Sequence, residues 1–270
     1  MDLISGRDAL LDLTGGDAWV RWGLPSEPGE IWVHRGVVMV ERPAPRPGFW
    51  VITPGNQSPP TRHAGPDDVT AALRELRDGG HLQRLGAASL SIEQQWSELV
   101  PPIIRVDAGG RWEWHWTTTM PAPGRSPQDP DVSAIVELDD HRDAEEITAF
   151  LHTHNHRVWQ AAGTGLMELW LGVREHTGAL LAVGAMMRED SGAPHLGSIV
   201  THTDHRGRGL GHLVSAALTR RGIADHGVCT LGMYSDNDAA RRVYERIGYR
   251  CAHAWHSRSI VPNPPDRAVV

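Results

Sequence analysis

The chain has 270 residues, of which 40% are hydrophobic and 22% charged, as in ordinary folded proteins. The net charge is −7 and no basic run alternates with aromatic residues, so nucleic acid is not an expected partner. No apolar run approaches the roughly 20 residues that span a bilayer, and no basic region precedes an apolar stretch at the N-terminus. Two cysteines make no disulfide framework. The expected compartment is therefore the cytoplasm, without a membrane partner.

The first 120 residues predict a smaller α+β domain. Residues 31–40 and 49–53 are rich in β-branched and aromatic side chains, which is typical of strands. Residues 67–77 place apolar side chains on one helical face and are followed by Gly79-Gly80. Residues 111–116 alternate, so that their three tryptophans point to one side of a strand. Those tryptophans either form core or line a pocket, and the usual role of large aromatics favours core.

A proline-rich stretch divides the chain. Residues 121–130 carry four prolines and one glycine, which disfavours both helix and central strand. We therefore expect a domain over 1–120, a linker over 121–130 and a second domain over 131–260.

The second half predicts a mixed α/β plan. Its apolar periodicity alternates between the strand and helix repeats, and a glycine-rich turn opens one helix. The expected strands are 132–138, 168–174, 180–187, 196–201, 228–233 and 249–256, and the expected helices are 143–156, 209–224 and 237–247.

Alternating glycines stand at the start of the helix over 209–224. Residues 206–211 read Arg-Gly-Arg-Gly-Leu-Gly and follow an apolar strand and a polar turn. The first amides of a helix lack intrahelical acceptors, and glycines let an anion approach the backbone. The run therefore predicts a phosphate-binding site. It is not a nucleotide P-loop, because that motif needs a lysine and the chain has none.

This run resembles the pyrophosphate-binding motif of the GNAT N-acetyltransferase superfamily, [Q/R]-x-x-G-x-[G/A]. A second GNAT pattern follows about thirty residues later, with Asn237, then Tyr244 seven residues on, then Gly248-Tyr249. The resemblance covers roughly residues 132–257. It implies a GNAT acyltransferase fold in the C-terminal half. It also implies a tandem arrangement, in which the N-terminal half is a degenerate GNAT-like or pocket-forming domain that shapes the acceptor site.

The resemblance also implies roles for individual residues. The backbone of Ile199, Val200 and Thr201 would pair with the pantetheine arm of acetyl-CoA. Tyr244 would protonate the departing CoA thiolate, and Asn237 would contact the pantetheine or the reacting region. The pyrophosphate would lie against the glycine run, which consists of Arg206, Gly207, Arg208, Gly209, Leu210, Gly211 and His212.

The general base is less defined by the motifs. Where many GNAT members carry a glutamate on the fifth strand, this chain has Gly232, and where others carry one on the fourth strand it has His195. Histidine is a competent base near neutral pH, so His195 is a candidate. A plain turn histidine and a water relay stay open as alternatives.

Structural roles also stay open for the other candidates. Tyr244 could be a core tyrosine on an amphipathic helix, and Asn237 could be a helix N-cap. His152 and His156, four residues apart, could share a metal ion, but no carboxylate stands at matching spacing, and no metal is expected. The two cysteines are expected to pack on neighbouring strands.

The sequence thus predicts an N-acetyltransferase that moves an acetyl group from acetyl-CoA, as co-substrate, to the amine of a small molecule by direct attack. Two alternatives stay open, a non-catalytic acyl-CoA-binding or sensing module and an acetyltransferase of protein lysines or N-termini. A homodimer also stays open.

Overall fold

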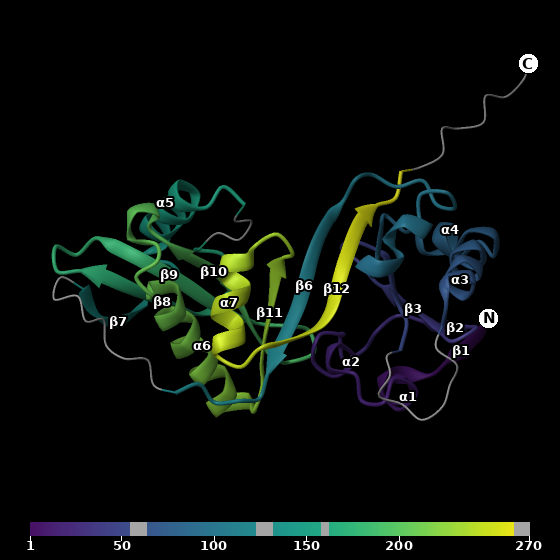
Figure 1. The fold of residues 1–270 in the computed structure, drawn as a ribbon, viewed down its shortest axis with the longest axis horizontal. Coiled ribbons are helices and arrows are strands. Elements are labelled where there is room, and N and C mark those ends of the chain that lie inside the picture. The colour runs from purple at the N-terminus through teal and green to yellow at the C-terminus, as the bar shows by residue number, and fades with distance from the viewer. Residues whose placement is uncertain (55–63, 123–131, 158–161, 262–270) are drawn as a thin grey trace, which may run out of the picture. The chain divides into compact units, whose positions relative to one another are not determined.

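The chain forms two compact units (Figure 1). The computed structural model describes residues 1–54, 64–122, 132–157 and 162–261. Unit 1 comprises Met1–Glu113, Tyr234–Asp236 and Ala252–Val270, and unit 2 comprises Trp114–Met233 and Asn237–Cys251. These boundaries differ from those expected at 120 and 131. Most of the expected linker 121–130 lies outside the described residues, and the C-terminal strand contributes most of its length to unit 1.

Unit 1 is built on a mixed sheet. Its strands are β1 (Asp2–Ile4), β2 (Ile31–His34), β3 (Val37–Arg42), β4 (Gly48–Ile52), β5 (Ser89–Glu93) and β12 (Arg250–Ser259), in that spatial order. All neighbours pair antiparallel except β4 and β5, which are parallel. Strand β6 (Gly110–Thr117) begins in this unit and ends in the other.

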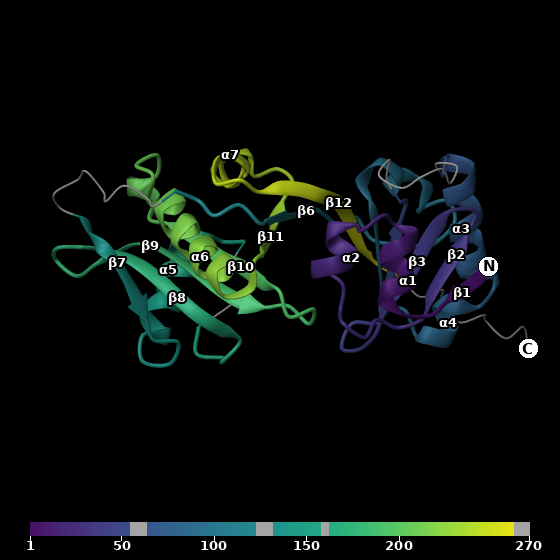
Figure 2. The same ribbon diagram turned by 90° about the horizontal axis from the view of Figure 1, so that it is seen from below.

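Helices cover both faces of this sheet (Figure 2). The helices are α1 (Gly6–Leu13), α2 (Ala18–Trp22), α3 (Pro66–Asp78), α4 (His81–Leu85) and the short η1 (Gln94–Leu99). The apolar face of α3 packs on alternate strand residues such as Val37 and Met39. Val38 and Val40, which point to the opposite face, are buried as well. The helix expected over 67–77 is therefore confirmed.

The strand expected over 31–40 is wrong in one respect, because the segment forms the two strands β2 and β3. Arg35 and Gly36 between them have φ of 53° and 81°, and His34 pairs with Val37. Positive φ at both central residues is the geometry of a two-residue hairpin turn, which the β-branched run on either side conceals in the sequence.

The strands of unit 2 follow the order β11-β10-β9-β8-β7, with β6 next to β11. These strands are β7 (Val132–Leu138), β8 (Met167–Glu175), β9 (Leu180–Arg188), β10 (Pro194–Thr201) and β11 (Cys229–Tyr234). Neighbours from β7 to β10 are antiparallel, and β10 and β11 are parallel. Each expected strand of this half is present within two residues at its start and three at its end.

The helices of unit 2 are α5 (Ala144–His154), η2 (Thr203–His205), α6 (Leu210–His226) and α7 (Asp238–Arg246). Side chains of α6 and α7 share one core cluster with the sheet, and side chains of α5 share another. Gly184 of β9 lets α6 approach closely, because a Cβ there would stand 2.7 Å from Val214. Helix α5 ends two residues before the expected 156, because Asn155 is extended.

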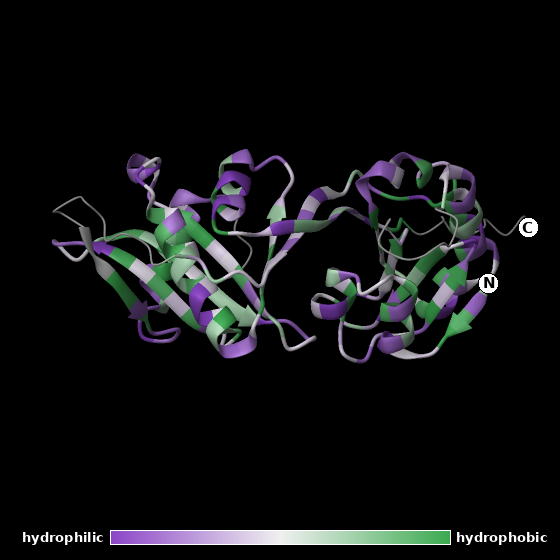
Figure 3. Cartoon of the chain, turned by 60° about the horizontal axis from the view of Figure 1, so that its bottom comes forward, coloured by the Kyte–Doolittle hydropathy of each residue, from purple (hydrophilic) through white to green (hydrophobic). Residues whose placement is uncertain are grey.

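Hydrophobic residues concentrate in the strands and the inward helix faces of each unit, whereas outer turns are hydrophilic (Figure 3). Within the described residues, none of the helices combines the length and apolar character that crossing a membrane requires. The fold class is thus the mixed α/β plan that the sequence predicts.

Candidate functional site

Strands β10 and β11 separate after a short shared ladder. They pair in parallel only at His195–Thr230 and Leu196–Leu231. The register of β10 against β9 then shifts between Gly197 and Val200, and Ser198 within this bulge has a φ of 53°. A bulge bends the strand that carries it. Beyond the bulge, Val200 and Thr201 continue to pair with β9, whereas β10 no longer pairs with β11. The edge of β10 that faced β11 can therefore pair with another extended chain.

The phosphate-binding segment follows directly on β10. Gly209 is the N-cap of α6 in the left-handed conformation, and no side chain caps the helix there. The amides of Leu210, Gly211 and His212 fall in the first turn, where no intrahelical acceptor exists. A Cβ on Gly211 would lie 3.2 Å from Thr201 Oγ1, so the helix start packs closely against the end of β10.

The space in front of this helix start is open and surrounded by potential donors. A Cβ on Gly207 or Gly209 would meet no atom within 4 Å. Arg206 and Arg208 are exposed beside these glycines. The Nδ1 atoms of His205 and His212 are buried without a hydrogen-bond partner among the described residues. Unsatisfied donors around a helix N-terminus are the chemistry that receives a phosphate.

Tyr244 and Asn237 come from α7 and its N-cap. Asn237 caps the helix, with its Oδ1 accepting the amide of Ala240 at 3.1 Å. The Tyr244 ring lies in the core cluster of α6, α7 and the sheet, and its centroid is 5.8 Å from that of Tyr249. Burial raises the pKa of Tyr244 well above its ordinary value. Its phenol is therefore protonated throughout the neutral range.

Comparison with known proteins identifies this arrangement. Residues 170–258 match the family model described as FR47-like protein. No curated protein is significantly similar to the chain. A solved GCN5-related N-acetyltransferase from Kribbella flavida is 15% identical, with a TM-score of 0.52 and coverage of 96% of this chain and 98% of that one. Another from Sphaerobacter thermophilus is 12% identical, with a TM-score of 0.54 and coverage of 85% and 78%. The chain has the GNAT fold.

In this GNAT fold, the candidate base His195 stands where β10 and β11 are still paired. Its Nδ1 lies 2.8 Å from Glu189 Oε1 and 3.0 Å from Thr230 Oγ1, and its side chain is 13% exposed. Burial raises the pKa of Glu189, but the charge and hydrogen bond of His195 outweigh it, so the pKa is lowered. An ionised Glu189 thus orients the His195 ring through Nδ1, which directs its Nε2 to other partners.

Sequence reasoning missed Glu189. The turn between β9 and β10 brings it to His195. In this turn the backbone N–H of Glu189 donates to the carbonyl oxygen of Ala193 at 2.9 Å. The sequence signal was the short Glu-Asp-Ser-Gly-Ala segment, whose Gly192 has a φ of 86° as a tight turn requires. A hairpin there places residues on either side of the turn next to each other.

Cys229 does not have the surroundings of a nucleophile. Cys229 is fully buried on β11, and burial raises the pKa of its thiol to about 11. A thiol with that pKa is almost wholly protonated at neutral pH, and the thiolate is the reactive form. Cys251 is exposed on β12.

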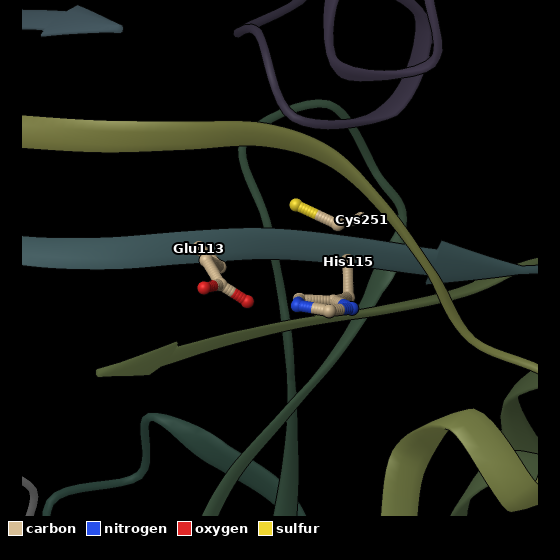
Figure 4. A group of neighbouring side chains, drawn as sticks. All are labelled: Glu113, His115 and Cys251. Carbon is tan, nitrogen blue, oxygen red and sulfur yellow. The ribbon is translucent and has the colours of Figure 1, made fainter. Parts of the chain in front are cut away.

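Two groups of side chains bear on metal binding. His156 lies beyond the end of α5, so it does not share a helical face with His152. Among the described residues, the ligand atoms of Glu113, His115 and Cys251 lie within 4.8 Å of one another (Figure 4). Glu113 and His115 are two residues apart on β6 and so point to one side. Such proximity is common without an ion, and we assign no metal to it.

Proposed function

We propose that the chain is an acyl-CoA N-acyltransferase that moves an acetyl group from acetyl-CoA to the amine of a small molecule. The observation that carries the proposal is the sequence of features along unit 2. A separated edge of β10 leads within ten residues to an uncapped, glycine-rich start of α6. The first feature suits an extended amide chain, and the second suits a pyrophosphate.

The residues present fit acetyl-CoA at both ends of that path. The amide groups of the pantetheine arm have the spacing of a short extended strand, and Ile199, Val200 and Thr201 offer backbone groups on the side that β11 has left. The amides of 207–212 and the charge of the helix start offer donors for the pyrophosphate. Arg208 adds a positive charge on the exposed side of the same segment.

The chemistry is direct aminolysis of a thioester. The amine nitrogen bonds to the carbonyl carbon, the C–S bond breaks, a base takes one proton from the amine, and the thiolate receives a proton. Tyr244 carries its proton at neutral pH, as a tyrosine of ordinary or raised pKa does, so it has a proton to donate. His195, oriented by Glu189, is the candidate base through Nε2. Binding both reactants in one site supplies the remaining acceleration.

A small cationic acceptor suits the composition of the chain. The net charge of −7 favours the approach of a positively charged amine over that of an acidic partner, through long-range attraction. A protein lysine or N-terminus carries the same reacting group, so the experiment below includes peptides.

One observation favours a second candidate, a non-catalytic acyl-CoA-binding module. Gly232 is exposed on β11, where many GNAT members carry the glutamate base. A protein that keeps the phosphate-binding segment at the start of α6 but has no base would bind acetyl-CoA without turning it over.

The deciding experiment is an acetyl-CoA assay over a panel of amines, amino acids, aminoglycosides and peptides, with release of free thiol as readout. Acceptor-dependent thiol release supports the enzyme, and the acceptor that gives it decides between small molecule and protein. Saturable binding without any turnover supports the binding module. Absence of binding by calorimetry contradicts both.

A further inference from the structure

The loop between β10 and the glycine run is held by the C-terminal end of α5. The Nδ1 of His154 accepts the backbone N–H of Thr203 at 3.3 Å and lies 3.1 Å from its Oγ1. Arg206 donates from Nη2 to the carbonyl oxygen of His154 at 2.6 Å. Two successive parts of the loop are thus tied to one residue of a helix that is 49 residues away in sequence.

A second histidine, His202, stabilises the loop of which it is part. The Nδ1 of His202 accepts the backbone N–H of Asp204 at 3.2 Å and so caps η2. The rings of His154 and His202 face each other, with centroids 4.1 Å apart and planes tilted by 43°. Phe150 of α5 also packs on His154, with centroids 4.6 Å apart, and its centroid lies 6.3 Å from that of His202.

Both histidines must be neutral to make these contacts. A ring nitrogen can accept an N–H only if it carries no proton, so each ring has its proton on Nε2. Two imidazolium rings at this separation would also repel each other. Protonation of the pair therefore removes two hydrogen bonds to the loop and adds a like-charge contact.

We propose that His154 is a positioning residue for acyl-CoA, whose neutral ring, packed on His202, holds residues 202–206 so that the amides of 207–212 face the pyrophosphate. The proposal rests on the proposed function for the ligand, but the anchoring of the loop is a property of the free protein. It follows that acidification, by protonating His154, loosens the loop and weakens acyl-CoA binding.

The charges around His154 agree with a neutral ring. Burial lowers its pKa, the charge of Arg206 and any charge that His202 gains lower it further, and only Asp204 opposes them. His205, in the same loop, has its ring centroid 5.1 Å from that of His202. The nearest histidines in sequence on the α5 side are His152 and His156. A helix C-terminus ordinarily favours a cation, but Arg206 already supplies it at the His154 carbonyl. The anchored state is therefore present above about pH 6.5 and is lost as the pH falls below it.

The test compares three variants of the full chain. His154→Phe keeps a ring against His202 and Phe150 but cannot accept the Thr203 amide. His154→Asn places an oxygen near the Nδ1 position, and it cannot be protonated. His152→Phe is the matched control, because His152 is exposed two residues away on the same helix. Calorimetry with CoA at pH 7.5 and 5.5 gives the affinity, and hydrogen exchange gives the protection of the Thr203 amide.

We expect His154→Phe to weaken CoA binding at pH 7.5 by about fivefold or more, the worth of one lost hydrogen bond. His154→Asn should bind within about threefold of wild type at pH 7.5 and lose less affinity at pH 5.5 than wild type does. The pH dependence of a variant is compared with that of wild type, because the phosphates of CoA also titrate near pH 6 and change the affinity of every variant alike. The control should match wild type throughout.

Two results would overturn the proposal. One is CoA affinity of His154→Phe within twofold of wild type, and the other is a pH dependence of His154→Asn equal to that of wild type. If wild type does not bind CoA at all, the proposed function fails, and hydrogen exchange then decides on the anchor alone. Unchanged protection of the Thr203 amide in His154→Phe would refute it.

Discussion

Gly209 is the position where backbone geometry and the proposed ligand can be separated experimentally. It has a φ of 81°, which costs a residue with a Cβ about 1–2 kcal/mol. No atom within 4 Å would meet that Cβ, so Gly209→Ala causes strain without a clash. We expect a loss of about 1 kcal/mol in the free energy of unfolding, from strain alone.

The chain supplies a matched control at the other end of the same helix. Gly227 is the C-cap of α6, has a φ of 73° and would also meet no atom within 4 Å with a Cβ. Gly227→Ala should therefore cost about the same stability. The helix has 17 residues. Its ends are thus roughly 25 Å apart, and the control leaves the proposed pyrophosphate site untouched.

The assay is acetyl-CoA binding by calorimetry, next to urea unfolding of both variants. Gly209→Ala should weaken binding at least about tenfold, or roughly 1.4 kcal/mol, because the added methyl group projects into the open space before the amides. Gly227→Ala should bind as wild type does. A folded Gly209→Ala with wild-type affinity would show that the pyrophosphate binds elsewhere. Equal weakening of binding in both variants would show that the loss of affinity reflects only the stability of the helix.

Three further predictions concern turnover and stoichiometry. Tyr244→Phe keeps the packing and removes the hydroxyl, so kcat in the thiol-release assay should fall about 10²-fold with little change in acetyl-CoA binding, and activity within twofold of wild type would exclude the acid role. Glu189→Gln removes the charge that orients His195, so kcat in the thiol-release assay should fall about tenfold or more with little change in acetyl-CoA binding, whereas kcat within twofold of wild type would separate this pair from the chemistry. Titration should saturate at one acetyl-CoA per chain, because no helix among the described residues of unit 1 opens on the spaced glycines seen at 207, 209 and 211, and two equal sites would contradict this.

The sequence predicts unit 2 better than unit 1 for a physical reason. In helix α6 and the strands around it, apolar side chains repeat with a regular spacing over long segments that end at glycines. The spacing and the segment length therefore indicate the same secondary structure. In unit 1 the elements are short. Helices α2 and α4 have five residues each, and η1 follows β5 without a break. Such segments are stabilised by tertiary packing rather than by local propensity, so their own sequence carries little signal.

The candidate site shows the same division. The glycines and Arg206 are adjacent in sequence, and a local motif is enough to place them. Contacts that bring distant segments together are not local, as with His154 of α5 and Thr203 of the loop. A stretch reading His-Thr-His-Asn-His suggests metal binding first, and only the fold shows that its middle histidine accepts a backbone amide. No spacing rule connects the two positions.

Unit 1 contains a buried charge cluster that the proposed chemistry does not use. His253 of β12 is 6% exposed, and its Nε2 and Nδ1 lie 3.0 Å from Asp17 and 3.1 Å from Glu93. Burial lowers the pKa of His253, but the hydrogen bonds and charges of the two carboxylates outweigh it and raise the pKa to about 9. The ring also stacks on Trp255, with centroids 4.9 Å apart. The imidazolium thus balances two carboxylates inside the unit.

The raised pKa predicts how stability changes with pH. The contribution of His253 is fully present below its unfolded pKa of about 6.5 and is lost as the pH rises through about 9. A shift of this size corresponds to about 3 kcal/mol. Urea unfolding followed by tryptophan fluorescence should therefore show stability falling between pH 6.5 and 9.5, and His253→Gln should be less stable at pH 6.5 and lack that slope. His256→Gln is the control, because burial lowers the pKa of His256 and the ring is neutral in this range. If His253→Gln kept the alkaline slope of wild type, the carboxylates would not be held by a charged histidine, and the cluster would be an ordinary hydrogen-bond network.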